Sequence, residues 1–105
     1  MKKVYYSIQA AEDLENIFYG LALWEKHPMT LMQVENYVRE IRRACDNLEN
    51  AIVHRKCTYK IHQQYGIYVS TYRRNSSTVW YIIYNIDLQE NIRIEKIINN
   101  YMTTK

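Results

Sequence analysis

The order of apolar and polar residues predicts a short strand and then a helix at the start of the chain. Residues 3–8 alternate between the two kinds of side chain, as a half-buried strand does. From Ala10 onward, apolar residues recur at spacings of three and four, which predicts an amphipathic helix. Glu12 and Asp13 would then lie in its first turn, where the helix dipole favours negative charge. The His-Pro pair at residues 27–28 is expected to end this helix.

A second helix is predicted from Thr30 onward. Thr30 followed three residues later by Gln33 has the form of a capping box, in which each side chain accepts a backbone N–H of the other residue. The apolar stripe behind this box has helical spacing and consists of Val34, Tyr37, Val38, Ile41, Cys45, Leu48 and Ile52. Both helices have one apolar and one charged face, so they form a hairpin that needs a surface to lie on.

The second half of the chain is expected to provide that surface as a sheet. Three stretches rich in β-branched and aromatic residues are predicted to be strands, namely residues 67–73, 78–86 and 91–98. Short polar turns at residues 74–77 and 87–90 join them, which favours an antiparallel meander. Residues 54–65 show no clear period and are expected to be a long loop.

We therefore expect one α+β domain over residues 1–105, with the helical hairpin packed on one face of a small, mainly antiparallel sheet. A chain of 105 residues with 48% hydrophobic residues, two glycines and one proline suits a single packed core. No apolar stretch is long enough to span a membrane. Cys45 lies in a helical stripe and Cys57 in a basic segment, which gives no disulfide framework, so we expect a reducing, cytoplasmic location.

Charge is divided unevenly along the chain. Residues 1–53 hold six Lys or Arg against eight Asp or Glu, whereas residues 54–105 hold eight against three, so the net charge of +3 is −2 in front and +5 behind. Residues 50–86 contain no Asp or Glu at all. A field of one sign attracts anions and speeds their arrival, so we expect a partner that carries phosphates or acidic side chains.

Three stretches of the chain, together with their order, resemble one protein family. A-E-D-L-E-N-I at residues 11–17 resembles the start of the first helix in that family, and W-Y-I-I-Y-N-I at residues 80–86 resembles its central strand. The alternating aliphatic residues of 92–99 resemble its closing strand. On these stretches the chain is similar, over nearly its whole length, to the RelE/ParE superfamily of bacterial toxins from type II toxin–antitoxin pairs.

The resemblance implies a growth-inhibiting toxin and a small acidic antitoxin protein as its partner. Ribonuclease members of the family typically carry Arg at the position of Tyr81 and basic residues or His at those of Asn99, Asn100 and Tyr101, so this chain keeps the scaffold and changes the chemistry. Three functions stay open: ribosome-associated mRNA cleavage, which we expect first, ParE-type inhibition of DNA gyrase, and a degenerate toxin fold that only binds. No cofactor and no membrane partner are expected.

RNA cleavage requires a base for the 2′-hydroxyl, positive charge for the transition state and an acid for the leaving oxygen. Alternation along residues 78–86 puts Tyr81 on the face away from the helices. A tyrosine acting as a base near neutral pH needs its pKa lowered by about three units, or about 4 kcal/mol. His54 and His62 titrate nearer neutral pH but lie in the predicted loop. The candidate catalytic residues are Arg73, Tyr81, Lys96 and Tyr101.

Basic and aromatic residues together also suit the binding of single-stranded RNA, because Arg and Lys hold phosphates while exposed aromatic rings stack on bases. The candidate nucleic-acid-binding residues are Arg55, Lys56, Lys60, Arg74, Trp80 and Asn99. Many of the tyrosines equally suit the packing of a small sheet. His54, Cys57 and His62 do not have the spacing of a compact metal-binding motif, and we predict no metal site.

Overall fold

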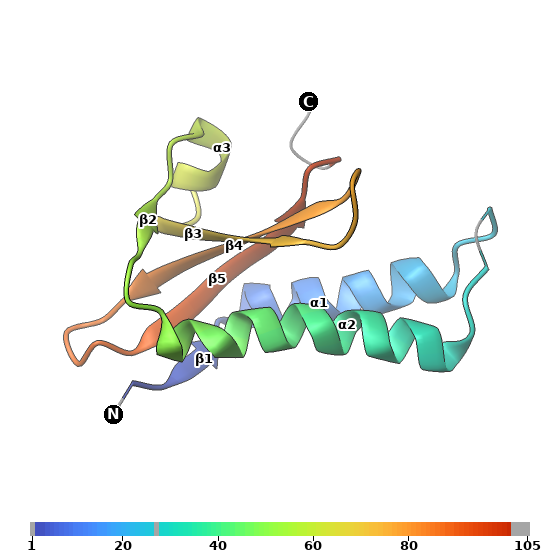
Figure 1. The fold of residues 1–105 in the computed structure, drawn as a ribbon, viewed down its shortest axis with the longest axis horizontal. Helices are drawn as coiled ribbons and strands as arrows, with labels where there is room; N and C mark the ends of the chain where they lie inside the picture. Colours follow the sequence, from blue (N-terminus) through green and yellow to red (C-terminus); the bar gives the residue numbers. More distant parts are fainter. Residues whose placement is uncertain (1, 27, 102–105) are drawn as a thin grey trace.

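The computed structural model describes residues 2–26 and 28–101 and shows an α+β fold with a five-stranded mixed sheet (Figure 1). The elements in chain order are β1 (Val4–Tyr6), α1 (Ile8–Ala22), α2 (Leu31–Asp46), the 3₁₀ helix η1 (Asn47–Asn50), β2 (Arg55–Lys56), α3 (Lys60–Gln63), β3 (Tyr68–Arg73), β4 (Val79–Ile86) and β5 (Ile92–Asn99). The helices α1 and α2 lie side by side against one face of the sheet, and α3 lies on the opposite side. The predicted fold class and helical hairpin are confirmed.

The sheet has the strand order β1-β5-β4-β3-β2. Strands β3, β4 and β5 form the predicted antiparallel meander, each within about one residue of the predicted bounds. Strand β1 pairs with β5 in parallel, from Val4 opposite Ile92 to Tyr6 opposite Ile94. Because β1 is parallel to β5 while the other neighbouring strands are antiparallel, the sheet is mixed.

Helix α1 begins earlier than the spacing of apolar residues predicts, because Ser7 caps it. The Ser7 hydroxyl accepts the Ala10 N–H at 3.0 Å and donates to the Glu95 carbonyl at 3.2 Å. Ile8 is therefore a helix residue with 81% of its surface exposed. The expectation that Glu12 and Asp13 lie in the first helical turn is wrong.

The end of α1 also differs from the prediction, whereas the start of α2 matches it. Helix α1 ends at Ala22, before the His-Pro pair, of which His27 lies outside the described residues. The capping box is confirmed, since Thr30 Oγ1 accepts the Gln33 N–H at 3.1 Å and Gln33 Oε1 accepts the Thr30 N–H at 2.8 Å. The apolar stripe of α2 runs on to the buried Leu48 in η1, but Ile52 is 95% exposed.

The main core lies between the helical hairpin and the sheet. Strand β4 turns Trp80, Ile82 and Tyr84 toward the helices, where they pack with buried residues of α1, α2 and β5. The Trp80 indole N–H donates to the Tyr37 hydroxyl of α2 at 3.1 Å, which satisfies the one polar group of that buried ring. Each fully buried large apolar side chain of this kind stabilises the fold by about 1.5–3 kcal/mol.

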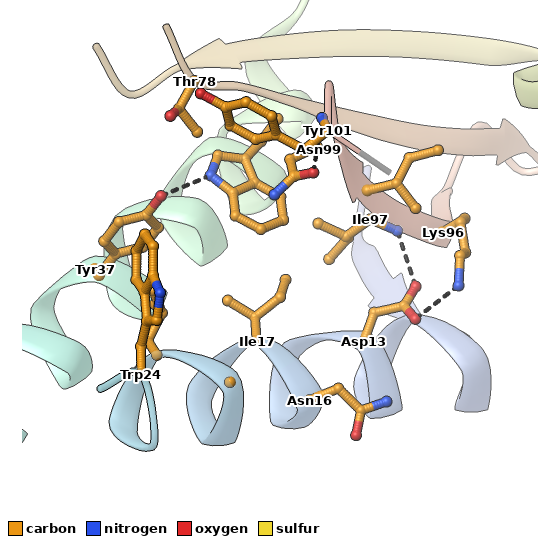
Figure 2. Close-up of a pocket in the computed structure, with 14 residues that line it drawn as sticks. Asp13, Asn16, Ile17, Trp24, Tyr37, Thr78, Lys96, Ile97, Asn99 and Tyr101 are labelled. Carbon is orange, nitrogen blue, oxygen red and sulfur yellow. Dashed lines mark hydrogen bonds and ion pairs between the residues drawn. The ribbon is translucent and has the colours of Figure 1, made fainter. Parts of the chain in front are cut away.

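Asp13 joins α1 to the part of β5 that β1 does not reach. The pairing of β1 ends opposite Ile94. Beyond it, the Asp13 carboxylate accepts the Ile97 N–H at 3.0 Å and the Lys96 ammonium at 2.9 Å (Figure 2). Asp13 is only 7% exposed. A backbone N–H on a covered sheet edge needs an acceptor, and this side chain provides one.

We predict that Asp13→Ala lowers the free energy of unfolding by about 2–4 kcal/mol, because it leaves the Ile97 N–H without its acceptor and Lys96 without its counter-charge. Asp13→Asn should lose less, because its amide oxygen still accepts the Ile97 N–H. Urea titrations followed by circular dichroism measure both changes. Glu12→Ala, an exposed neighbour on α1, is the matched control and should stay within about 0.5 kcal/mol of the wild type. Equal stability of Asp13→Ala and Glu12→Ala would contradict this role of Asp13.

Candidate functional site

The candidate site lies on the face of the sheet turned away from α1 and α2, which we call the far face. Strand β4 presents Tyr81 and Ile83 to this face, while Ile82 and Tyr84 between and beside them belong to the helix-side core. Tyr81 is half-buried and lies opposite Thr71 of β3 and Ile98 of β5. Tyr81 therefore lies on the face that strand alternation predicts.

Residues 57–66, which we call the cover segment, pack over part of the far face. Cys57 is buried together with Ile83 and Ile98, and Tyr65 packs against this small cluster. At Gly66 the backbone approaches so closely that an added Cβ would lie 3.0 Å from Ile83 Cγ2 and 3.2 Å from the Tyr84 carbonyl oxygen. The predicted loop over residues 54–65 is therefore wrong in part, since it contains β2 and α3 and covers the sheet. These elements are too short to show a period in the sequence.

The ring of His62, in the cover segment, packs against the ring of Tyr81. The two ring centroids are 4.7 Å apart, and the other side of the His62 ring meets Tyr59 at 5.4 Å. His62 is 2% exposed, and burial lowers its pKa from the ordinary value. Burial thus favours the neutral form of the imidazole next to Tyr81.

Arg73 and Lys96 share the far face with Tyr81 but flank it on opposite sides. Arg73 pairs with Val79, two residues before Tyr81 along β4, so its exposed side chain lies nearer the β3–β4 turn than Tyr81 does. Lys96 pairs with Ile83, two residues after Tyr81 along β4, and so lies on the other side of Tyr81. Its ammonium is bound to Asp13 and lies 5.4 Å from the centre of the Tyr65 ring. Arg73 therefore offers an exposed charge, whereas the charge of Lys96 is already paired.

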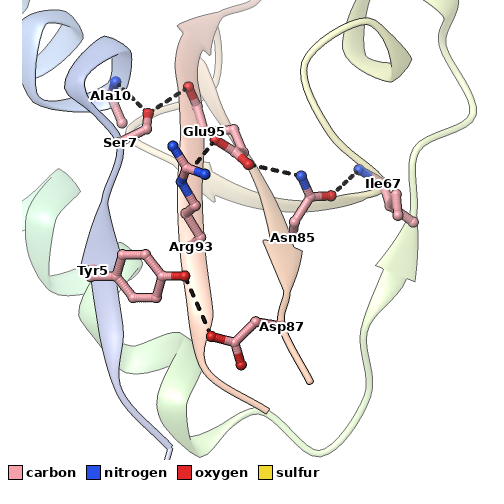
Figure 3. A network of polar contacts seen from close by, with 8 residues as sticks. All are labelled: Tyr5, Ser7, Ala10, Ile67, Asn85, Asp87, Arg93 and Glu95. Atoms are coloured by element: carbon pink, nitrogen blue, oxygen red, sulfur yellow. Dashed lines mark hydrogen bonds and ion pairs between the residues drawn. The ribbon is translucent and has the colours of Figure 1, made fainter. Parts of the chain in front are cut away.

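A polar network closes the other end of the far face (Figure 3). The Asn85 side chain accepts the Ile67 N–H at 2.9 Å and donates to Glu95 at 2.8 Å. Glu95 also pairs with Arg93 at 3.5 Å. These contacts fix the chain where it leaves the cover segment and enters β3. Sequence reasoning missed them, although an asparagine within an otherwise apolar strand was a signal.

The predicted nucleic-acid-binding residues divide between the two sides of the sheet. The exposed cations next to the far face are Arg55, which pairs with Val69 of that face, and Lys60 of the cover segment, whereas the exposed Lys56 pairs with Tyr68 and lies on the helix side. On the helix side, the Arg74 guanidinium lies 4.2 Å from the centre of the Tyr37 ring and pairs with Glu40. Trp80 is 3% exposed, so the expectation that its ring is free to stack on a base is wrong. Alternation along β4 turns it under the helices.

Asn99 and Tyr101 line a cleft of about 390 Å³ between α1 and the end of β5 (Figure 2). Asn99 Oδ1 accepts the Tyr101 N–H at 3.1 Å. Gly20 of α1 lines the same cleft, and an added Cβ there would meet no atom within 4 Å. Sequence analysis missed Gly20 and Trp24 as lining residues, although a glycine inside a predicted helix was a signal. The cleft lies on the helix side, so Tyr101 and Tyr81 do not converge.

His54, Cys57 and His62, which lack the spacing of a metal-binding motif, do not come together in the structure either. His54 Nδ1 lies 2.8 Å from the hydroxyl of Tyr84 on the helix side, where burial raises the pKa of Tyr84 to about 12. Cys57 and His62 belong to the cover segment on the far side. Across residues 2–26 and 28–101, no three His, Cys, Asp or Glu side chains gather closely enough to hold a metal ion.

Comparison with known proteins gives no match, so a functional assignment has to rest on the geometry of the candidate site. No family model, no curated protein and no solved structure matches the chain. Within the described residues, no helix is both long and apolar enough to cross a bilayer. What the structure provides is an acid-poor sheet face with an exposed arginine, a half-buried tyrosine and neighbouring cations.

Proposed function

We propose that this chain is the toxin of a type II toxin–antitoxin module, of the RelE/ParE kind, and that it inhibits translation by cleaving ribosome-associated mRNA. The observation that carries the proposal is the shared position of Arg73 and Tyr81 on the far face, beside the exposed cations Arg55 and Lys60. The order of strand, helical hairpin and meander agrees with what the family resemblance implies.

In this proposal Arg73 stabilises the negative charge that develops on the phosphate during attack by the 2′-hydroxyl. An exposed guanidinium presents several N–H donors to such oxygens. Tyr81 transfers a proton at the same place, because it lies on the adjacent strand one step from Arg73. Lys96 contributes positive field, and its contact with Asp13 positions it.

Tyr101 is proposed as a second proton-transfer group at the end of the sheet nearest Arg73. The Asn100 N–H donates to the Val79 carbonyl at 3.0 Å, and Val79 pairs with Arg73. The exposed Tyr101 ring therefore follows directly after the strand position beside Arg73. Because Tyr101 lines the cleft on the helix side, it would reach an RNA strand only where that strand passes around the end of the sheet, and not beside Tyr81.

The proposed partner that controls this activity is a small acidic antitoxin. The cover segment, β3 and β4 belong to a stretch, residues 50–86, without a single carboxylate, and Tyr59 and Ile67 expose their apolar side chains there. An acidic, amphipathic segment that folds on this surface would neutralise its charge and bury those side chains. The same binding would block access to Arg73.

Inhibition of DNA gyrase is the second candidate function, favoured by the helical hairpin. The hairpin extends beyond the sheet, and its far end exposes Leu23, Leu31 and Met32 (Figure 1). Exposed apolar side chains at the end of a projecting element suit a protein interface. A toxin fold that has lost catalysis and only binds is the third candidate.

We predict that Arg73→Ala and Tyr81→Phe each lower the rate of mRNA cleavage by about 10²-fold, because one removes transition-state charge and the other a transferable proton. Toeprinting on purified ribosomes with a defined message measures the rate, and circular dichroism checks that the variants fold. Arg39→Ala, an exposed cation on α2, is the matched control and should cleave normally. Tyr101→Phe tests the second proton-transfer group in the same assay. Unchanged cleavage by both Arg73→Ala and Tyr81→Phe would rule out this site.

We predict that Arg55→Ala and Lys60→Ala weaken binding to single-stranded RNA about equally for all sequences. Each removes one phosphate contact, so each should reduce the slope of log affinity against log salt by about 0.7–1. Fluorescence anisotropy at several salt concentrations measures the slope. Lys26→Ala, a cation near the other end of the molecule, should leave it unchanged. Loss of affinity without a change in slope would mean that these residues do not contact phosphates.

For the gyrase alternative, we predict that Leu23→Glu with Met32→Glu abolishes inhibition of DNA supercoiling if the hairpin binds gyrase. A supercoiling assay with purified gyrase measures this, and Arg73→Ala should inhibit as the wild type does. If wild-type protein leaves supercoiling intact while messages are cleaved in cells, the gyrase function is excluded. If it does neither and growth continues, the chain only binds.

A further inference from the structure

His62 is the one buried polar side chain of the described residues whose polar atoms all lack a partner. Neither Nδ1 nor Nε2 of its ring makes a hydrogen bond, and the side chain is 2% exposed. Buried polar groups are normally satisfied, so an unsatisfied one in a folded protein needs an explanation. The ring is held by packing alone, between Tyr59 and Tyr81.

The surroundings of His62 favour its neutral form. Cations on the neighbouring elements are Arg55, Lys56 and Lys60 beside it in the chain, Arg73 on β3, and Arg93 and Lys96 on β5. The uncharged titratable neighbours are Cys57, Tyr59, Tyr65 and Tyr81. Along β3, β4 and β5, Glu95 is the only carboxylate of the far face, and it is already bound by Asn85 and Arg93. An imidazolium at this place would find no free carboxylate on these strands.

The cover segment is fastened at its two ends and rests on the sheet between them. At its base the Cys57 N–H donates to the Ile67 carbonyl at 2.8 Å, next to the two residue pairs that join β2 to β3. The Ile67 N–H is held by Asn85. Within the described part of the chain, no hydrogen bond joins residues 58–65 to β3, β4 or β5. Their bonds are to one another, to Cys57 and to Gly66. A compact loop with adjacent ends can lift without breaking the sheet.

We propose that the cover segment is a proton-operated gate over Tyr81, which opens when the ring of His62 takes up a proton. In the closed form His62 is buried and unpartnered, so protonation favours the form in which the ring reaches water. Opening removes residues 58–65 from the far face and exposes the Tyr81 ring. The gate would change access to the sheet face whether or not the chain cleaves RNA.

The direction of the pH dependence follows from burial. Burial lowers the pKa of His62 in the closed form below its ordinary value of about 6.5, whereas the open form keeps the ordinary value. Closure is therefore fully favoured above about pH 6.5 and is progressively lost as the pH falls through 6.5 toward the lowered pKa. If the closed form takes up no proton in this range, the opening equilibrium rises about tenfold between pH 7.5 and 5.5.

Hydrogen exchange measured by mass spectrometry on the whole chain tests the gate. After correction for the intrinsic pH dependence of exchange, protection of residues 58–65 should fall about tenfold from pH 7.5 to 5.5, while protection of β4 and β5 should stay constant. His62→Phe keeps a ring of similar size that binds no proton, so its protection should not depend on pH. His54→Gln removes the imidazole on the helix side and should respond to pH as the wild type does.

Two further measurements keep the proposal falsifiable if His62→Phe folds poorly. Gly66→Ala brings a Cβ to 3.0 Å from Ile83, so it should raise opening at every pH and leave the tenfold response intact. An NMR titration of the wild-type His62 ring should give an apparent pKa below 6.5. A ring that titrates at or above 6.5, or protection of residues 58–65 that is equal at the two pH values, would overturn the gate. Neither outcome depends on whether mRNA is cleaved.

Discussion

The contact between Asp13 and the last part of β5 is the constraint on which the rest of the structure depends. Strand β1 covers only the beginning of β5, so the remaining edge must be closed by something other than a strand. A carboxylate from α1 closes it, accepting the Ile97 N–H while Lys96 neutralises it. Lys96 belongs to the far face and contacts the Tyr65 ring of the cover segment. One buried carboxylate thus links the helical hairpin, the sheet edge and the candidate site.

Strand β4 gives the candidate site its rigidity, because both of its faces are covered. Ile82 and Tyr84 pack under the helices, and Ile83 packs under the cover segment. A strand held on both faces fixes the direction of Tyr81 without any contact to a ligand. The two covers differ in strength, since the hairpin buries a large core whereas the cover segment adds a small cluster. The position of Tyr81 is therefore fixed, while access to it depends on the weaker cover.

Local signals in the sequence predicted most of the fold, and long-range ones were missed. The capping box of Thr30 and the three strands of the meander are set by neighbouring residues, so they could be found. The role of Asp13 could not, because Ile97, whose N–H it accepts, lies 84 positions away. For Trp80, the basic composition suggested exposure, although alternation along the strand places it on the same face as Ile82 and Tyr84. Alternation was correct, because a strand with one face on a core must bury every second residue.

The lack of carboxylates between residues 50 and 86 has two physical consequences that act together. On the outside, Arg55, Lys56 and Lys60 keep a field that attracts phosphates. Inside the cover segment, His62 is left without a counter-charge, so its protonation costs free energy as long as the ring is buried. Opening gives the ring access to water, where this cost disappears, so the lack of carboxylates that attracts anions on the outside also makes the cover segment sensitive to protons.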